Sequence, residues 1–268
     1  LKKLFGHKIF WVADYRDAWQ FGPLLDKKVL PFRMKRIEKT DAKVIRACDV
    51  AVFVTPRTRE LYVDKYPWTK KKARVITNGF DEDDFAELCP IPYPEPTLVY
   101  MGRMDRNYGD PLKLFAGMEL ASVTGLRLVH VGTIDPQLLA RIETKGITTY
   151  CHLGYQPHRR ALEHILDAWV NVIIRDNSPA SEQDYPGKLF ELLRAGRPIL
   201  SIGAPGSIIG DLLHETGLGL HVDATDPHAI ACALNQLLKA PQQTIAPTAR
   251  INQFSRAEIT RQLLRLYP

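Results

Sequence analysis

The sequence of 268 residues predicts an α/β protein with two parallel sheets, one on either side of a proline-rich segment. Short apolar runs rich in β-branched residues alternate with amphipathic stretches of helical length, which is the pattern of parallel sheets with crossover helices. Segment 89–96 contains four prolines. Proline fixes φ and donates no backbone hydrogen bond, so this segment fits neither a helix nor an inner strand. We therefore expect it to be a linker between two domains.

The predicted elements differ in number on the two sides of the linker. Before it we expect strands at 9–13, 50–54 and 73–77, with helices at 33–48 and 57–65. After it we expect six strands separated by helices, followed by a last helix at 250–266; the strands are 98–101, 126–131, 148–153, 169–174, 199–202 and 218–222. Six strands with intervening helices make a complete doubly wound sheet.

The first domain is expected to be incomplete. Three parallel strands form a small sheet with unpaired edges, which natural proteins avoid. The chain also opens at Leu1, directly before a strand, so we expect the front of the first domain to be missing from this chain. The predicted organisation is a partial Rossmann-like domain at 1–88, a linker at 89–96, a complete Rossmann-like domain at 97–249 and a C-terminal helix at 250–268.

The composition favours a cytoplasmic globular protein. Apolar residues make up 45% of the chain and charged residues 25%, and no stretch approaches the roughly 20 apolar residues of a membrane helix. The four cysteines lie far apart without a C-x-x-C pair, which favours reduced thiols. The net charge is +6, with basic clusters at 27–28, 33–36 and 70–72. We expect these mainly to be solvated surface, although they weakly favour peripheral contact with the inner face of a membrane. No nucleic-acid motif accompanies them.

Residues 186–198 carry the most informative pattern. A Pro-Gly turn enters a predicted helix, and Gly196 ends it before a buried strand. Lys188 and Glu191 share one face of this helix. Lys188 lies where the helix dipole is positive, which costs a few tenths of a kcal/mol unless an anion binds there. Glu191 can accept hydrogen bonds from ribose hydroxyls, as acidic residues do in dinucleotide sites. For this segment alone, a surface Lys–Glu pair worth about 0.3 kcal/mol stays open.

Glycines follow three strands at the edge where parallel sheets bind ligands. Gly102-Arg103 follows the first strand after the linker, and Gly132 and Gly154 end the next two. Glycine allows close backbone approach, and the planar guanidinium of arginine grips phosphate oxygens. Arg106 offers a second cation nearby. Together with the helix that begins at Lys188, these residues predict a site for a diphosphate and a flat base.

Motifs along nearly the whole chain resemble the GT-B-fold glycosyltransferases of family 4, called glycosyl transferases group 1. Residues 13–19 (A-D-Y-R-D-A-W) are similar to the D-x-R-D-P-W segment of one branch, with Ala18 in place of proline. The other matches follow in the family's order: 36–55, V-I-T-N-G-F-D at 75–81, V-Y-M-G-R at 99–103, L-G-Y at 153–155 and P-G-K-L-F-E-L-L-R-A-G-R-P-I-L at 186–200. Each motif is degenerate, and their collinear order makes the resemblance specific.

The resemblance implies a GT-B fold and transfer of a sugar from a nucleotide diphosphate sugar to a glycan or lipid-linked acceptor. It also implies retention at the anomeric carbon and no metal or other cofactor. Arg103 and Lys188 would neutralise the diphosphate leaving group, and Glu191 would hold the ribose. Arg16 and Asp17 are further catalytic candidates, expected to face the cleft between the domains. The expected donor-binding residues are Gly102, Arg103, Arg106, Gly132, Gly154, Tyr155, Gly187, Lys188, Leu189 and Glu191.

One departure from the family pattern keeps other functions open. Many relatives have two glutamates eight positions apart, the first touching the donor sugar, whereas the residue eight before Glu191 is Gln183. Its neighbours Glu182 and Asp184 are acidic. The alternatives are a sugar-nucleotide epimerase of the same fold and a catalytically inactive domain that binds a nucleotide or a partner.

Two acidic clusters have plainer explanations. Asp14 and Asp17 with Arg16 fit a strand-end salt-bridge set as well as a cleft site. The acidic run 81–84 invites a metal interpretation, but acidic residues also favour the start of a helix, and no other ligand accompanies them at the spacing a metal site needs. We therefore expect no metal. Three histidines around Gly154, at 152, 158 and 164, are expected to be solvent-facing or capping residues.

Overall fold

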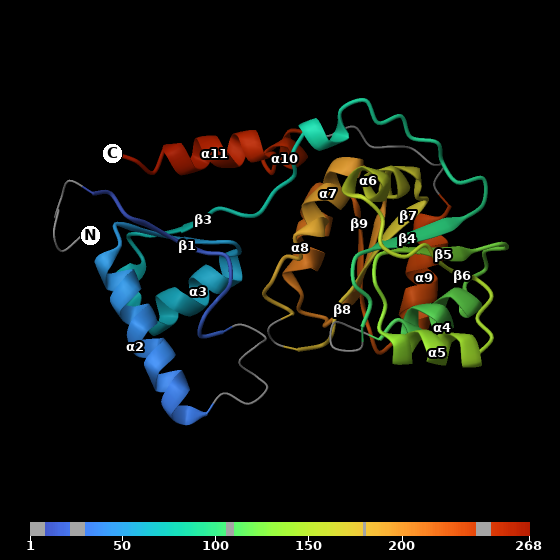
Figure 1. Cartoon of the computed structure of the whole chain (residues 1–268), viewed down its shortest axis with the longest axis horizontal. Coiled ribbons are helices and arrows are strands. Elements are labelled where there is room, and N and C mark those ends of the chain that lie inside the picture. The colour runs from blue at the N-terminus through green and yellow to red at the C-terminus, as the bar shows by residue number, and fades with distance from the viewer. Residues whose placement is uncertain (1–8, 22–29, 106–109, 179–180, 240–247) are drawn as a thin grey trace.

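The computed structural model describes residues 9–21, 30–105, 110–178, 181–239 and 248–268. They form two lobes, each built on a parallel sheet (Figure 1). No helix in these ranges is long and apolar enough to cross a membrane.

The sheet of the first lobe has the order β1-β2-β3 in the described residues. Its elements are β1 (Val12–Tyr15), α2 (Pro31–Ala47), β2 (Val50–Phe53), α3 (Pro56–Lys65) and β3 (Ala73–Val75). Strand β1 begins later than the predicted 9–13, because Val12 is the first residue that pairs with β2, opposite Val50.

A buried carboxylate organises the interior of the first lobe. Asp41 on α2 is fully buried and accepts hydrogen bonds from the hydroxyls of Tyr15 and Tyr62 at 2.6 and 2.7 Å and from the amide of Gln20 at 2.5 Å. Burial raises the pKa of both tyrosines, so they stay donors at neutral pH. These bonds fix the end of β1, which holds the first three residues of the A-D-Y-R-D segment at 13–17.

The second lobe has six parallel strands in the order β6-β5-β4-β7-β8-β9. The strands are β4 (Thr97–Met101), β5 (Arg127–Val131), β6 (Tyr150–His152), β7 (Val170–Ile174), β8 (Ile199–Gly203) and β9 (Gly219–Asp223). The direction of strand addition reverses between β4 and β7, and open α/β sheets bind ligands outside the carboxyl ends of the strands at such a reversal. The predicted doubly wound sheet is confirmed.

Helices cover both faces of the second sheet. On one face pack α6 (His158–Asp167), α7 (Lys188–Ala195) and α8 (Ile208–Thr216). On the other pack α4 (Leu112–Leu120), α5 (Pro136–Thr144) and α9 (Pro227–Leu237). Strands that are apolar on both sides, such as β7, are buried throughout.

The proline-rich segment 89–96 forms neither helix nor strand, as predicted. It lies against the second lobe: the hydroxyl of Tyr93 contacts Nδ1 of His164 at 2.6 Å, and the indole of Trp169 donates to the Tyr93 carbonyl at 2.8 Å. The chain crosses between the lobes earlier, since Ile76 packs in the first lobe and Phe80 in the core of the second.

The C-terminal segment returns to the first lobe. Instead of the single predicted helix at 250–266, there are α10 (Ala249–Asn252) and α11 (Arg256–Leu264), because Ser255 caps α11 by accepting from the Glu258 amide at 3.3 Å. The backbone amide of Phe80 donates to the Phe254 carbonyl at 3.1 Å. This bond links the segment where the chain passes from the first lobe to the second with the segment where it returns. Helix α11 then extends over the first lobe, where Ile259 packs near β2 (Figure 1).

Candidate functional site

The ends of β4 and β7, with the start of α7, bring the central predicted residues together. Lys188 donates a hydrogen bond from Nζ to the Met101 carbonyl at 2.6 Å, and Nζ lies 3.8 Å from the ring centroid of Tyr100. A Cβ on Gly102, whose φ is +118°, would lie 3.5 Å from the same nitrogen. The ammonium group therefore lies on the end of β4, against the residues that directly precede Arg103.

The position of Lys188 changes its acidity. Burial lowers the pKa of Lys188 to about 7, and the nearby guanidinium of Arg175 lowers it further in the same direction. A lysine near its pKa at neutral pH gains a proton, and so full charge, when an anion binds beside it. The sequence predicted the placement of Lys188 at the helix start, but not this burial.

Arg103 extends from the same strand end. Its side chain is 67% exposed, and its Nε lies 2.7 Å from the carboxylate of Asp105, which is only 3% exposed. The hydroxyl of Tyr100 donates to the Arg103 carbonyl at 2.8 Å and fixes the backbone there. The predicted partner Arg106 lies outside the described residues.

The three predicted glycines lie in one row and have different structural reasons. Gly132 has a φ of +143°, and a Cβ on it would lie 2.1 Å from the Gly102 carbonyl oxygen, so the two loops approach too closely for any side chain. The Gly132 amide donates to the Gly154 carbonyl at 2.8 Å. Gly154 has a φ of +71°, with nothing within 4 Å of a Cβ. A flat ligand therefore has open space at Gly154 and a rigid floor at Gly132.

Two histidines that were not predicted as site residues support this row. His130 is fully buried and donates from Nε2 to the Gly102 carbonyl at 2.8 Å, while its Nδ1 accepts from the Tyr150 hydroxyl at 2.8 Å. Burial lowers the pKa of His130 to about 4, so it is neutral at pH 7 and keeps this tautomer. His152, exposed as expected, donates to the Gly132 carbonyl at 2.8 Å. The sequence signal for the role of His130 was the presence of a histidine inside the otherwise apolar run that forms most of β5.

Glu191 and Lys188 do not pair with each other. Glu191 is one turn into α7, with its side chain 22% exposed, and its Oε1 lies 3.0 Å from Nε2 of His158. The surface Lys–Glu pair left open by the sequence is therefore not formed. His158 pairs with Glu191 instead of simply facing solvent.

The remaining predicted donor-site residues are divided between surface and core. Tyr155 is 79% exposed, and Gly187 is exposed at the start of α7. Leu189 is wholly buried in the core beneath α7, so its side chain faces away from the strand ends.

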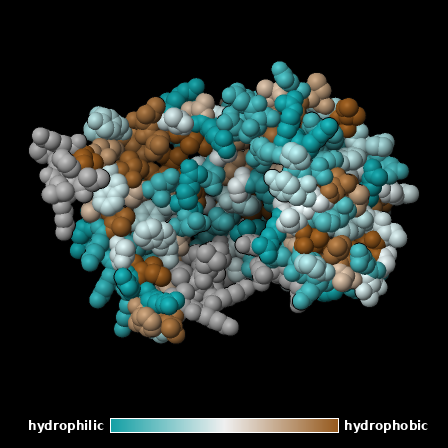
Figure 2. Space-filling view, viewed as in Figure 1, coloured by the Kyte–Doolittle hydropathy of each residue, from teal (hydrophilic) through white to brown (hydrophobic). Residues whose placement is uncertain are grey.

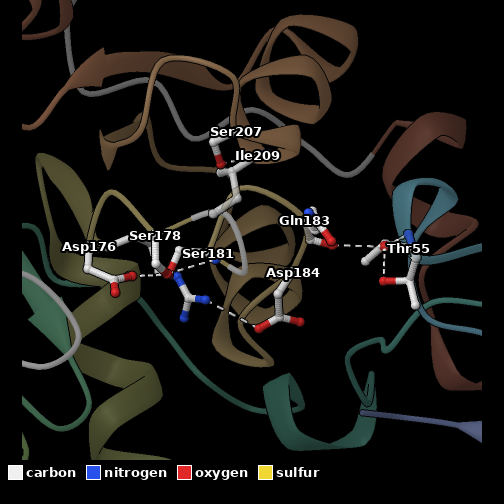
Figure 3. Close-up of polar contacts among 10 residues, drawn as sticks. Thr55, Asp176, Ser178, Ser181, Gln183, Asp184, Ser207 and Ile209 are labelled. Atoms are coloured by element: carbon white, nitrogen blue, oxygen red, sulfur yellow. Dashed lines mark hydrogen bonds and ion pairs between the residues drawn. The ribbon is translucent and has the colours of Figure 1, made fainter. Parts of the chain in front are cut away.

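Contacts between the lobes gather on the segment just before α7. The hydroxyl of Thr55 donates to the Gln183 carbonyl at 2.8 Å (Figure 3). Asp184 pairs with Arg175 at 3.3 Å, and Asp17 of the first lobe lies near enough to raise the pKa of Asp184, although burial contributes most to that increase. The side chain of Glu182 lies close to Gly206, with its carboxylate 3.8 Å from where a Cβ would be.

Asp17 and Arg16 behave differently at the end of β1. Asp17 lies near enough to Asp184 of the second lobe to raise its pKa, whereas Arg16 pairs with Asp14 at 3.1 Å and also donates to the side chain of Asn78. Arg16 is 63% exposed. Arg16 and Asp14 form the salt bridge that the sequence left open, and a cleft role for Asp17 stays a prediction. Figure 2 shows hydrophilic residues across the middle of this face, where the lobes meet.

The acidic run at 81–84 forms structural contacts. It leads into a short 3-10 helix at Asp83–Phe85, not the α-helix start expected from the sequence, and Asp81 and Glu82 form ion pairs with Arg256 and Arg194. Within the described ranges, no three His, Cys, Asp or Glu side chains are grouped so that they could hold a metal ion. The absence of a metal or other cofactor from the reaction stays a prediction.

Solved structures similar in fold to this chain include glycosyltransferases. Sucrose-phosphate synthase from Thermosynechococcus elongatus is 20% identical, with a TM-score of 0.66 over 99% of this chain and 69% of that one. Anabaena HepE in complex with UDP is 14% identical, with a TM-score of 0.69 over 95% of this chain and 71% of that one. The α,α-trehalose 6-phosphate synthase from Burkholderia multivorans is 14% identical, with a TM-score of 0.58 over 87% and 63%. The chain has the GT-B fold. No family model matches the sequence, and a search of curated proteins finds no match. In this GT-B chain Lys188 and Arg103 lie at the strand ends of the second lobe, and Asp17 of the first lobe lies near enough to Asp184 to raise its pKa.

Proposed function

We propose that this protein is a glycosyltransferase that uses a nucleotide diphosphate sugar as donor and a glycan or lipid-linked molecule as acceptor. The observation that carries the proposal is the hydrogen bond from the Lys188 ammonium to the Met101 carbonyl at the end of β4, two residues before Arg103. Lys188 from α7 and Arg103 from the end of β4 lie at the same edge of the sheet, where open α/β sheets bind ligands. The HepE structures in complex with UDP and with UDP-glucose add support from a protein of the same fold.

The proposed mechanism rests on charge. When the bond between the sugar and the diphosphate breaks, negative charge develops on the departing phosphate, and cations already in place lower the barrier to that step. Arg103 and Lys188 would supply these cations. Glu191 would accept hydrogen bonds from the ribose hydroxyls, exchanging its contact with His158 for the ligand. The flat base would lie over Gly154, where a Cβ would meet nothing within 4 Å. We propose that the anomeric configuration is retained, as the family resemblance implies.

The acceptor would enter between the lobes. Asp17 lies on that side, close enough to Asp184 to affect its pKa, and closure of the lobes would exclude water that otherwise hydrolyses the donor. Arg16 is bound to Asp14 and Asn78 and would position this strand end without contacting the reacting atoms.

A panel of nucleotides tests the donor site. We expect one of UDP, ADP, GDP and dTDP to raise the melting temperature well above the effect of its own nucleoside, because the cations recognise the diphosphate. A ligand at a hundredfold excess over its Kd stabilises by about 2.7 kcal/mol, which a thermal shift detects. If none of the four stabilises the protein, the proposed function is wrong. NMR of a bound donor sugar incubated without acceptor separates an epimerase, which converts it, from an inactive domain, which binds and releases it unchanged.

Peripheral membrane contact stays part of the proposal. The first half of α2 carries Arg33, Lys35, Arg36 and Lys39 beside Phe32, which is 66% exposed. Basic side chains near an anionic lipid surface contribute about 1 kcal/mol each. We expect the protein to sediment with vesicles that contain about 30–40% phosphatidylserine, which gives them a negative surface potential like that of an anionic leaflet. It should not sediment with neutral vesicles. Equal sedimentation with both would contradict this contact.

A further inference from the structure

Arg175 lies at the same strand edge as the predicted cations, although no motif pointed to it. It directly follows β7, and β7 pairs in parallel with β4 so that Asn171 lies opposite Val99. Continued to the ends of both strands, this register sets Arg175 level with Arg103. Both arginines therefore leave the sheet at its carboxyl edge, on either side of the point where the strand order reverses.

The Arg175 side chain is held in a confined space and is incompletely paired. It is only 13% exposed, and its Nη2 lies 3.3 Å from the Asp184 carboxylate, a long ion pair. Its Nε is buried and forms no hydrogen bond within the described part of the chain. Its Cβ would be 3.2 Å from a Cβ at Gly203, so a side chain at 203 would press on Arg175. A buried N–H without a partner costs free energy unless a ligand satisfies it.

Arg175 also lies close to Lys188. Burial lowers the pKa of Lys188 and Arg175 adds to that effect. Burial raises the pKa of Tyr100, the ring beneath the Lys188 ammonium, and Arg175 offsets part of that rise, so all three groups share one electrostatic environment. Two cations in poorly solvated surroundings repel each other, and Asp184 is the carboxylate paired with Arg175 there. The single ion pair with Asp184 does not neutralise both cations. Unneutralised cations at the edge of a parallel sheet are expected where an anionic ligand binds.

We propose that Arg175 is a third binding residue for the donor diphosphate, and that Asp184 occupies the place of the anion until the donor displaces it. This inference rests on the proposed function. On donor binding, the Arg175 guanidinium would turn from Asp184 to a phosphate oxygen, and its Nε would gain a partner. Asp184 would then exchange its ion pair for solvent, to which 43% of its side chain is already exposed.

A purely structural pair is the competing explanation. Asp184 follows Gln183, whose carbonyl accepts from Thr55, so the Arg175–Asp184 pair could simply anchor the contact between the lobes (Figure 3). The two explanations predict opposite effects of removing the carboxylate. If Asp184 competes with the ligand, its loss tightens binding; if it anchors the segment that leads to Lys188, its loss weakens binding.

Calorimetry on the full chain tests the proposal, using whichever of UDP, ADP, GDP and dTDP binds most tightly, with its nucleoside as the ligand without phosphates. We expect Arg175→Gln to raise the Kd of the diphosphate about tenfold or more, the usual effect of losing a charge-assisted hydrogen bond, and to leave the nucleoside Kd unchanged. Arg175→Lys should restore part of the loss. Asp184→Asn should lower the diphosphate Kd about two- to fivefold, because the competing charge is gone while the side-chain shape remains.

Arg194→Gln is the matched control, since Arg194 forms an ion pair with Glu82 away from the strand ends and should leave both Kd values unchanged. Equal losses for the diphosphate and the nucleoside, or weaker binding in Asp184→Asn, would overturn the inference. If Arg175→Gln does not fold, Arg175→Lys and Asp184→Asn still decide it. A wild-type protein that binds none of the four diphosphates overturns the proposed function, whereas wild-type binding that Arg175→Gln leaves intact overturns this inference alone.

Discussion

Replacing Lys188 with methionine is expected to weaken donor binding about a hundredfold, roughly 2.7 kcal/mol, without destabilising the fold. The ammonium group that donates to the Met101 carbonyl and lies over the Tyr100 ring would be lost, while an unbranched apolar side chain would remain in its place. We expect the Kd of the nucleoside diphosphate to rise roughly a hundredfold, about 2.7 kcal/mol, and turnover to fall by a further factor of about 10² to 10³, since a preorganised cation acts most strongly on the departing charge. Calorimetry and a donor-consumption assay measure the two effects.

The same substitution should leave the folded protein as stable as the wild type at neutral pH, or more stable. The pKa of Lys188 is lowered from 10.5 to about 7 in the folded chain, so between these values the unfolded chain binds more protons and the stability of the wild type rises with pH. Lys188→Met removes this dependence and should melt at the same temperature or higher at pH 7. Lys145→Met, at the exposed C-cap of α5, is the control and should alter neither binding nor its pH profile. A large loss of stability in Lys188→Met would show that the lysine is structural.

The same pKa predicts how donor binding depends on pH. Because the anion favours protonated Lys188, binding at pH 7 should take up roughly half a proton at this site, and the Kd should rise as the pH increases above about 7. Calorimetry in two buffers with different ionisation enthalpies counts the protons. A Kd that is flat from pH 7 to 9, with no proton uptake, would contradict the assignment of Lys188 to the diphosphate.

The residues at the strand ends could be predicted from the sequence, because the carboxyl ends of the strands lie at one edge in every parallel sheet. Alternating apolar runs and helices fix a parallel sheet, and all carboxyl ends of a parallel sheet meet at one edge. Gly102, Arg103 and Lys188 were therefore predicted together without knowledge of the strand order. The position of Lys188 followed from the helix start that Pro186-Gly187 signals.

The remaining features depend on register and on how the lobes meet. Arg175 was missed because only the pairing of β7 with β4 sets it level with Arg103. His130 was missed because a histidine in an apolar strand is ambiguous until its partner, here the Gly102 carbonyl, is known. The contact of Thr55 with Gln183 joins residues far apart in sequence and follows from the placement of one lobe against the other.

Replacing Gly132 with alanine is expected to disrupt the donor site through the backbone alone. The new Cβ would lie 2.1 Å from the Gly102 carbonyl oxygen and 2.6 Å from its carbon, and neither atom belongs to a flexible side chain. The φ of +143° adds strain for any L-residue. The loop at 101–103 must therefore move, which breaks the His130 bond to the Gly102 carbonyl and shifts Arg103 and the seat of Lys188.

Gly154→Ala provides the matched comparison for this prediction. Gly154 ends the next strand of the row and also has a positive φ, +71°, but a Cβ there meets nothing within 4 Å. It should cost only the left-handed backbone conformation, about 1–2 kcal/mol of unfolding free energy. Because the base is proposed to lie over Gly154, the Kd should also rise, but by less than about tenfold, roughly 1.4 kcal/mol. Gly132→Ala should lose donor binding by at least about 30-fold, roughly 2 kcal/mol, and cost about 3 kcal/mol or more in unfolding free energy. Equal effects of the two alanines in denaturant titrations and calorimetry would mean that backbone strain, not the approach of the two loops, is why glycine is required at 132. In that case the row would be a set of ordinary turns, and the donor site would depend on its side chains alone.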